Sequence, residues 1–466
     1  MDLERVIAAL APRDVVGRAP LDVADLAYDT RAVTPGALFF CVRGANADGH
    51  ELAPQAVAAG AVALVVERPV EVQVPQLVVA DSRMAMAPAA DVFFGHPTYD
   101  LDVVGITGTN GKTTTAHLVY SILAAAGRRP GLLGTIEARV GGERRAVVRT
   151  TPEAIDLQRT FREMLDAGDR SCAMEASSHA SALHRLDEVR FAALVFTNLT
   201  PDHLDFHGTM ERYYEAKRRL FVEGERPPAA INVGDPWGRK LAAARPDAIT
   251  FGLAEDAQVG PAALDGIDLK LRGRFNVENA LGAVAVARIL GIDDDAVALG
   301  LAAVRSVPGR FEAVDESQPF EVIVDYSHTP DSLENALRAA RDLAGSSGRV
   351  LCVFGCGGDR DREKRPLMGR IAAALADVPI LTTDNPRSED PLAIIDEVLG
   401  GANSEVEVEP DRREAIARAL EAAREGDVVL IAGRGAEPAQ EVAGKRLPFD
   451  DRDVAREALR RLQAPA

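Results

Sequence analysis

A loop rich in glycine and threonine could hold the phosphates of a nucleotide. The apolar run 101–106 leads into residues 107–115, which contain two glycines and a Gly-Lys-Thr triplet, and a helical pattern follows. Glycines let backbone N–H groups turn inward around phosphate, and the start of a helix adds a positive dipole. We expect Lys112 to neutralise the β- and γ-phosphates and the Thr113 hydroxyl to ligate Mg²⁺. The general Walker pattern has glycine where this chain has Ile106, so the match to generic NTPases is incomplete. The predicted phosphate-binding residues are Gly108, Thr109, Asn110, Gly111, Lys112, Thr113 and Thr114.

Side chains that could bind a metal ion follow two further apolar runs. The run 172–174 ends in Glu175, an acid placed to hold Mg²⁺ downstream of the phosphate loop. The run 193–196 leads to His203 and His207, which have the i, i+4 spacing of a zinc pair. No further ligand pattern supports zinc, so the zinc interpretation is weak.

Lys217 lies on the aromatic face of a helix predicted for residues 211–221. A lysine on such a face usually extends its amine to water. Alternatively, partial desolvation favours the neutral amine, which can add CO₂ and become an anionic Mg²⁺ ligand. The residues alone favour the first interpretation.

A basic segment follows the apolar run 350–354 and could bind an anionic substrate. It is either a solvated charged loop, since acidic residues alternate with the basic ones, or a substrate-binding loop, which its flanking glycines favour. The segment 355–361 lacks the full Gly-x-Gly-x-x-Gly pattern of a dinucleotide site. The basic residues are Arg349, Arg360, Arg362, Lys364, Arg365 and Arg370.

These motifs require strands that end at one edge of a sheet. Short apolar runs alternate with helical segments along 466 residues, which predicts an α/β fold. At roughly 100–200 residues per domain we expect three domains. The predicted boundaries are 1–97, 98–308 and 309–466. The third domain should be a doubly wound sheet, in which ligands bind beyond the carboxyl ends of the strands.

Composition excludes several classes of protein. The net charge of −18 argues against broad binding of nucleic acid or membrane surfaces. No run of about 18 apolar residues could span a bilayer, and the first residues do not resemble a signal peptide. The four cysteines form no zinc spacing, and we expect them to be reduced thiols of a cytoplasmic protein.

The Gly-Thr-Asn-Gly-Lys-Thr-Thr loop resembles the phosphate loop of the Mur ligase family. The resemblance extends to the segments 273–279, 309–312 and 325–330, which implies that they contact ATP. It implies a uridine-nucleotide-binding first domain, a central ATPase-like domain and a Rossmann-like third domain. It places His203 beside Mg²⁺ and makes Lys217 the carbamylated lysine of the family. The further ATP-binding residues that it implies are Asn276, Asn279, Arg310, Asp325 and His328.

The resemblance also implies the two other substrates. Asp384-Asn385-Pro386-Arg387, otherwise a type I turn, marks the subgroup that adds meso-diaminopimelate to UDP-N-acetylmuramoyl-L-alanyl-D-glutamate in peptidoglycan synthesis. The residues implied to bind the UDP-linked substrate are Thr30, Thr150, Thr151, Ser177 and Arg185. Those implied to bind the amino acid are Arg360, Asp384, Asn385, Arg387, Gly433 and Glu437. Lys112, Glu175, His203 and Lys217 form the implied catalytic group of an enzyme that acts as a monomer.

Two alternatives stay open at this point. Arg434 and Ala436 stand where the subgroup has lysine and histidine, which would fit a related ligase with another acceptor, such as L-lysine. A non-catalytic nucleotide switch would share the phosphate loop, but it would not require Glu175, His203 and Lys217 together.

Overall fold

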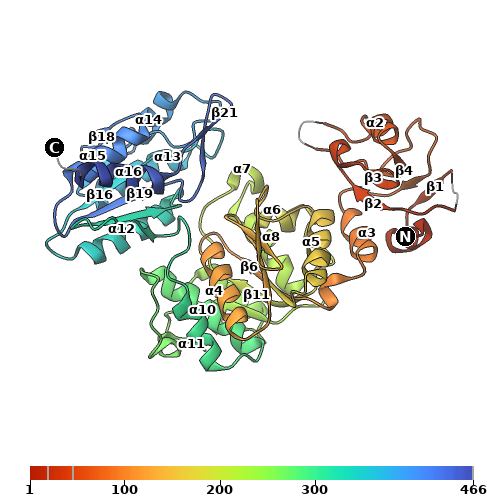
Figure 1. Ribbon diagram of the computed structural model, residues 1–466, viewed down its shortest axis with the longest axis horizontal. Helices are drawn as coiled ribbons and strands as arrows, with labels where there is room; N and C mark the ends of the chain where they lie inside the picture. Colours follow the sequence, from red (N-terminus) through yellow and green to blue (C-terminus); the bar gives the residue numbers. More distant parts are fainter. Residues whose placement is uncertain (18–19, 45–46, 464–466) are drawn as a thin grey trace. The chain divides into compact units, whose positions relative to one another are not determined.

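The computed structural model describes residues 1–17, 20–44 and 47–463. They form two compact units, which are described separately. The first unit comprises residues 1–107, 126–195 and 216–229, and the second comprises 108–125, 196–215 and 230–466. Figure 1 labels the helices and strands.

The amino-terminal part of the first unit is a five-stranded sheet with the strand order β1-β5-β4-β3-β2. Only the β1–β5 pair is antiparallel. Alternate residues of β3 face opposite sides, so Leu38 and Phe40 pack with α1 and α3 while Phe39 packs with α2. The elements are α1 (Leu3–Leu10), β1 (Asp14–Val16), β2 (Asp25–Ala27), β3 (Ala37–Phe40), α2 (Ala53–Ala58), β4 (Ala61–Val66), β5 (Gln76–Val78) and α3 (Met86–Phe93).

The rest of the first unit contains neighbouring strands in the order β11-β6-β10-β7-β8-β9. Strand β10 is parallel to β6 and β7, and its register pairs Glu175 with Ile106. The Glu175 carboxylate therefore lies at the carboxyl edge where β6 runs into the phosphate loop. The elements are β6 (Asp102–Thr107), β7 (Pro130–Leu133), β8 (Ala138–Val140), β9 (Glu143–Arg145), α5 (Ala154–Asp166), β10 (Ser171–Glu175), α6 (Ser178–Ala182), β11 (Phe191–Phe196) and α8 (Met210–Val222).

In the second unit, α4 begins at Lys112 and packs against two later helices, α10 and α11. Strands β12 and β13 pair with each other in parallel. The elements are α4 (Lys112–Ala125), α7 (Leu204–His207), β12 (Ala229–Asn232), α9 (Pro236–Ala244), β13 (Ile249–Phe251), α10 (Arg274–Ile289) and α11 (Asp294–Ala303).

The carboxyl-terminal part of the second unit is a six-stranded sheet with the order β14-β15-β19-β16-β17-β18, parallel except for β14. Its strands are β14 (Glu312–Ala313), β15 (Glu321–Asp325), β16 (Val350–Phe354), β17 (Val378–Leu381), β18 (Glu407–Val408) and β19 (Val428–Ala432). A hairpin, β20 (Ala439–Val442) and β21 (Lys445–Pro448), follows β19.

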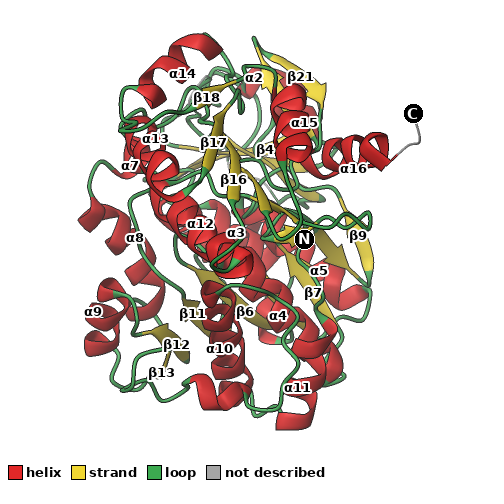
Figure 2. Ribbon diagram, turned by 90° about the vertical axis from the view of Figure 1, so that its left-hand side faces the viewer, coloured by secondary structure: helices red, strands yellow, loops and turns green. Residues whose placement is uncertain are grey.

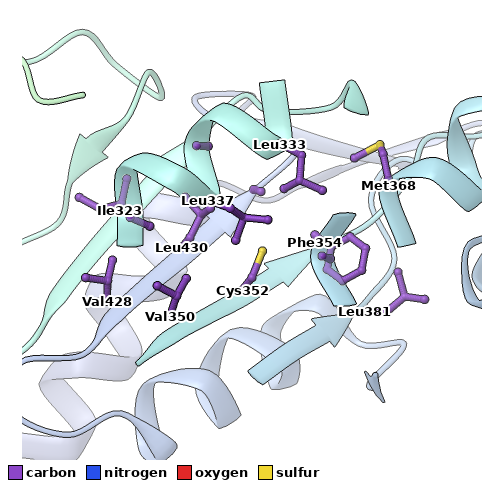
Figure 3. Close-up of a cluster of buried hydrophobic side chains, with 14 of the residues drawn as sticks. Ile323, Leu333, Leu337, Val350, Cys352, Phe354, Met368, Leu381, Val428 and Leu430 are labelled. Atoms are coloured by element: carbon purple, nitrogen blue, oxygen red, sulfur yellow. The ribbon is translucent and has the colours of Figure 1, made fainter. Parts of the chain in front are cut away.

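Helices cover both faces of this sheet, because neighbouring residues of each strand point to opposite sides. Cys352 and Leu430 face α12, α13 and α14, as Figure 3 shows for part of this cluster, while Leu351 and Val429 face α15 and α16. In Figure 2, α12 and α15 lie on opposite sides of β16. The helices are α12 (Pro330–Ala344), α13 (Lys364–Leu375), α14 (Pro391–Leu399), α15 (Arg412–Ala422) and α16 (Asp451–Gln463).

The predicted α/β class with mainly parallel sheets is confirmed, including the doubly wound carboxyl-terminal sheet. The three domain boundaries stay a prediction. None of the helices among the described residues is long and apolar enough to cross a membrane.

Candidate active site

The phosphate loop lies between the end of β6 and the start of α4, as the sequence predicts. Lys112 folds back over the loop, and its Nζ donates to the carbonyl oxygens of Gly108 at 3.1 Å and Thr109 at 2.7 Å. A bound phosphate would offer this ammonium group a charged acceptor in place of two neutral ones.

Two glycines of the loop cannot be replaced without displacing a neighbour. Gly108 has φ +150°, and a Cβ there would lie 1.9 Å from Oγ1 of Thr197. A Cβ on Gly111, at φ +83°, would lie 2.2 Å from Oδ1 of Asn279. Asn279 also donates from Nδ2 to Oδ1 of Asn276 at 3.0 Å, so the second predicted nucleotide-binding segment packs directly on the phosphate loop.

Asn110 connects the phosphate loop to residues that the sequence analysis did not single out. Its backbone N–H donates to Oδ1 of Asn198 at 2.8 Å, and its Nδ2 donates to Oδ2 of Asp331 at 2.9 Å. Burial raises the pKa of Asp331, while hydrogen bonds from Asn110 and Thr200 act in the opposite direction. Asp331 follows directly on the predicted segment 325–330, which is the only signal that the sequence offered for it.

Arg310 lies beside the phosphate loop, whereas Asp325 and His328 make contacts elsewhere. Nη2 of Arg310 donates to the Thr113 hydroxyl at 3.1 Å. Asp325 accepts from the backbone N–H of Phe311 at 2.7 Å. Burial and the neighbouring Lys364 lower the pKa of His328, whose Nδ1 bonds the carbonyl oxygen of Tyr326 at 2.8 Å.

In the first unit, Glu175 is 1% exposed and its carboxylate binds the segment that follows β7. Oε1 accepts from the backbone N–H of Thr135 at 2.7 Å, and Oε2 accepts from the Thr135 hydroxyl at 3.1 Å. The same hydroxyl lies 3.1 Å from that of Thr150. Thr135 was missed by the sequence analysis, although its place directly after a buried strand end resembles that of Glu175.

Three predicted substrate-binding residues meet beside this carboxylate. The Thr151 hydroxyl donates to the carbonyl oxygen of Glu175 at 2.7 Å and lies 3.2 Å from the Ser177 hydroxyl. Arg185 donates to the carbonyl oxygen of Thr151 at 3.1 Å and forms a 2.8 Å ion pair with Glu153. Thr30 belongs to a different element of the first unit, the short helix Thr30–Ala32.

Glu153 is a further residue that the sequence analysis missed. Its buried carboxylate pairs with Arg83 at 3.2 Å and Arg149 at 3.1 Å in addition to Arg185. Three guanidinium groups around one carboxylate leave a net positive charge, which suits an anionic substrate.

Lys217 is 1% exposed, so its amine does not extend to water as the residues alone favoured. It shares its face of α8 with the buried rings of Tyr213, Tyr214 and Phe221. His203, by contrast, is partly exposed, and its Nε2 lies 3.4 Å from Oδ2 of Asp202. His207 packs against Tyr213 with ring centroids 5.0 Å apart. Within the described residues, no three His, Cys, Asp or Glu side chains gather into a metal site.

Four of the predicted amino-acid-binding residues, Asp384, Asn385, Gly433 and Glu437, gather where β17 and β19 end. Asn385 donates from Nδ2 to Oε2 of Glu437 at 2.7 Å, and the Tyr326 hydroxyl donates to Oε1 of Glu437 at 3.1 Å. Gly433 has φ +123°, and a Cβ there would lie 2.3 Å from Oδ2 of Asp384. Burial and the neighbouring Asp384 raise the pKa of Glu437. A cationic group could therefore stabilise the buried Asp384 carboxylate and the partly buried Glu437 carboxylate at once.

Arg387 reaches the glycine-rich loop that follows β16. Its Nη1 donates to the carbonyl oxygen of Gly358 at 2.6 Å, and its Nε lies 3.7 Å from Oε2 of Glu441. Its backbone has φ +53°, in the left-handed region. Arg360 is exposed and donates only to the adjacent carbonyl oxygen of Asp359, at 3.4 Å.

The basic segment is not a single anion site, which corrects the interpretation that its glycines favoured. Arg349 pairs with Asp427 at 2.7 Å at the amino ends of the strands. Arg365 is fully buried and pairs with Glu389 and Glu397, both at 2.8 Å. Arg362 also pairs with Glu397. Three of the six cations, Arg349, Arg362 and Arg365, are therefore committed to carboxylates that are distant in sequence.

Comparisons with known proteins point to one family. Family models match residues 22–94 (Mur ligase family, catalytic domain), 106–287 (Mur ligase middle domain) and 309–435 (Mur ligase, glutamate ligase domain). The UDP-N-acetylmuramoyl-L-alanyl-D-glutamate–2,6-diaminopimelate ligase of Geobacillus thermodenitrificans is 48% identical, over 94% of this chain and 95% of that one. The Solibacter usitatus protein of the same name is 46% identical, over 99% and 98%. A solved structure with that name is 30% identical, with a TM-score of 0.65 and coverage of 95% and 96%.

Proposed function

Because this chain belongs to the Mur ligase family, we propose that it is an ATP-dependent ligase that adds meso-diaminopimelate to UDP-N-acetylmuramoyl-L-alanyl-D-glutamate. The names of the relatives at 46–48% identity support both substrates. The identity of the acceptor is supported by the group of residues at the ends of β17 and β19. There, Glu437 and Arg387 offer opposite charges. One end of meso-diaminopimelate carries an ammonium and a carboxylate, which such a pair can bind together.

The reaction requires two transfers at the D-glutamyl carboxylate. An oxygen of that carboxylate attacks the γ-phosphorus of ATP, ADP leaves, and an acyl phosphate forms. The amine of the acceptor then attacks the acyl carbon, and the tetrahedral adduct expels phosphate and loses a proton to leave the amide. Lys112 would stabilise the negative charge that spreads over the γ-phosphoryl oxygens.

The donor groups present fit Mg²⁺. In nucleotide sites Mg²⁺ is usually held by one or two protein oxygens together with phosphates and water, so a cluster of three acidic side chains is not required. From the family resemblance we assign Thr113, Glu175, His203 and Lys217, the last as a carbamate, as the residues that would hold Mg²⁺. Bound Mg²⁺ would neutralise phosphate charge during transfer. The burial of Lys217 supports the carbamate, because a buried amine is favoured in its neutral, CO₂-reactive form.

The UDP-linked substrate would be held in the first unit. Thr151, Ser177 and Arg185 form one connected group there, and Thr150 joins it through Thr135. Hydroxyl and guanidinium groups suit the carboxylates and amides of the peptide portion. We place Thr30 at the uridine end of the substrate.

The test is a screen of ADP release with the UDP-muramoyl dipeptide and each of several amino acids. Meso-diaminopimelate should give the highest rate, with product of the expected mass. Lys112→Ala should lower that rate by roughly 10²-fold or more while the circular dichroism spectrum stays unchanged. A higher rate with L-lysine would favour the related ligase with another acceptor. Steady ATP hydrolysis without any ligation would favour the nucleotide switch.

A further inference from the structure

We propose that Arg434 is a positioning residue for the acceptor: it fixes the orientation of the Asn385 amide and thereby presents Glu437 to the incoming ammonium group. The inference rests on the proposed function and adds to it a residue that determines specificity. Arg434 lies in the loop after β19 and has no exposed surface.

The orientation of the Asn385 amide is determined by three neighbours. Its Oδ1 accepts from Nη1 of Arg434 at 3.0 Å and from the backbone N–H of Glu441 at 2.9 Å. Its Nδ2 donates to the Glu437 carboxylate at 2.7 Å. Rotating the amide by 180° would bring its NH₂ group against two donors and its carbonyl oxygen against a carboxylate, so the three contacts select one orientation.

Arg434 is itself held in place without needing a carboxylate partner. Nη2 donates to the carbonyl oxygen of Phe449 at 3.0 Å, and the guanidinium lies 5.3 Å from the centre of that ring. The nearest acid, Asp451, is already bound in two places by Arg412, at 2.8 and 2.7 Å, and stays 3.9 Å from Nε of Arg434. Removing Arg434 therefore leaves the buried Arg412–Asp451 pair intact, so the fold should survive.

The loss of Arg434 should change how the Glu437 carboxylate is held. Nδ2 of Asn385 and the hydroxyl of Tyr326 each donate to a different oxygen of its partly buried carboxylate, which stabilises the ionised form. Without Arg434, Oδ1 of Asn385 keeps the single donor Glu441 N–H, so the amide is held less firmly and its hydrogen bond to Glu437 weakens. The carboxylate would then be a poorer partner for an ammonium group. Glu437 is connected to Thr113 of the phosphate loop through two intervening side chains, those of Tyr326 and Arg310, so ATP binding should change less.

The experiment compares Arg434→Met and Arg434→Lys with the wild type in steady-state assays. Arg434→Met should raise the KM for meso-diaminopimelate about tenfold or more, with the KM for ATP changed less than about twofold. Selectivity over L-lysine should fall. Arg434→Lys keeps a hydrogen-bond donor, so its KM for meso-diaminopimelate and its selectivity over L-lysine should both lie between those of Arg434→Met and the wild type. In an Asn385→Ala background, Arg434→Met should add little, because coupled residues are not additive.

Arg349→Met is the matched control. Like Arg434→Met it removes a guanidinium from the carboxyl-terminal sheet, but Arg349 is partly buried, pairs with Asp427 and lies at the opposite ends of the strands. It should lower the Tm without changing acceptor selectivity. The proposal is overturned if Arg434→Met leaves the acceptor KM unchanged, if it raises both KM values alike, or if Arg434→Lys loses as much as Arg434→Met. If the wild type uses another amino acid, the proposed function fails, and the same comparison is made with that amino acid.

Discussion

Asn110 of the phosphate loop donates a 2.9 Å hydrogen bond to Asp331 in the first turn of α12. The two residues are 221 positions apart, so this bond joins the nucleotide loop to the carboxyl-terminal part of the chain. The backbone of Asn110 is held at the same time by Asn198 and Thr197. Asp331 is therefore placed to stabilise the loop conformation that receives phosphate.

Asp331→Ala should weaken ATP binding about tenfold. The substitution leaves the side chain of Asn110 without a charged acceptor, and such hydrogen bonds typically contribute about 1.5–3 kcal/mol. Isothermal titration with ATP measures the effect directly. Asp342→Ala, an exposed acid on the same helix, is the control. Equal affinities for Asp331→Ala and the wild type would show that the bond has no part in nucleotide binding.

The pair of Arg365 and Glu389 should make the stability of the carboxyl-terminal sheet depend on pH. Two hydrogen bonds from the buried Arg365 lower the pKa of Glu389 from 4.5 to about 2. Since the folded-state pKa is the lower one, this stabilisation is present above about pH 4.5 and is lost as the pH falls towards 2.

Glu389→Gln should accordingly lower the Tm by a few degrees at pH 7, and the difference from the wild type should shrink as the pH falls below about 4.5. Thermal unfolding of the wild type and of Glu389→Gln between pH 7 and pH 3 measures the Tm difference and its dependence on pH. Glu405→Gln, at an exposed site, should have no such effect. A difference between wild type and Glu389→Gln that is constant over this range would contradict the ion-pair explanation.

Prediction from the sequence agrees best with the structure where the functional residues are neighbours along the chain. Lys112 and Gly108 belong to one loop whose function depends on local backbone geometry, so the motif alone predicts that the loop lies between β6 and α4. Thr135, Glu153 and Asp331 are common residue types in loops and helix starts. They acquire a role only when folding brings distant segments together.

Contacts between distant segments also explain why two interpretations of the residues differ from the structure, those of Lys217 and of the basic segment around Arg365. Helical periodicity places Lys217 on an aromatic face, but it cannot tell whether that face is covered. The local alternation of charges around Arg365 suggests a solvated loop or an anion site. Its actual partners, Glu389 and Glu397, lie 24 and 32 positions away.

Lys217 should be required as an amine that can react with CO₂. Lys217→Ala and Lys217→Arg should both lose most activity, since a guanidinium is always protonated and forms no carbamate. Wild-type activity should fall in buffer stripped of CO₂ and return when bicarbonate is added. Lys240→Ala is the matched control, because Lys240 lies over the Tyr214 and Trp237 rings but is exposed. Full activity of Lys217→Arg would rule out the carbamate.

Arg387 should determine the choice between meso-diaminopimelate and lysine. The two amino acids differ by one carboxylate at the far end, and a guanidinium can bind a carboxylate with two parallel hydrogen bonds. In the structure, Nη1 of Arg387 donates only to the carbonyl oxygen of Gly358, a neutral partner that a carboxylate would improve on. Lysine would satisfy Glu437 but would offer Arg387 no carboxylate beyond that of Glu441, and such a missing contact can reject an analogue by roughly 10⁴-fold.

Arg387→Ala should therefore lower kcat/KM for meso-diaminopimelate far more than it changes the KM for ATP, and it should reduce the advantage over lysine. The measurement is kcat/KM for both amino acids in the wild type, in Arg387→Ala and in Arg413→Ala. Arg413 is an exposed arginine of the same sheet's covering helix α15, paired with Glu457, so its loss should leave selectivity unchanged. If Arg387→Ala keeps the full wild-type preference, the extra carboxylate must bind elsewhere, because no other change in the pocket accompanies this substitution.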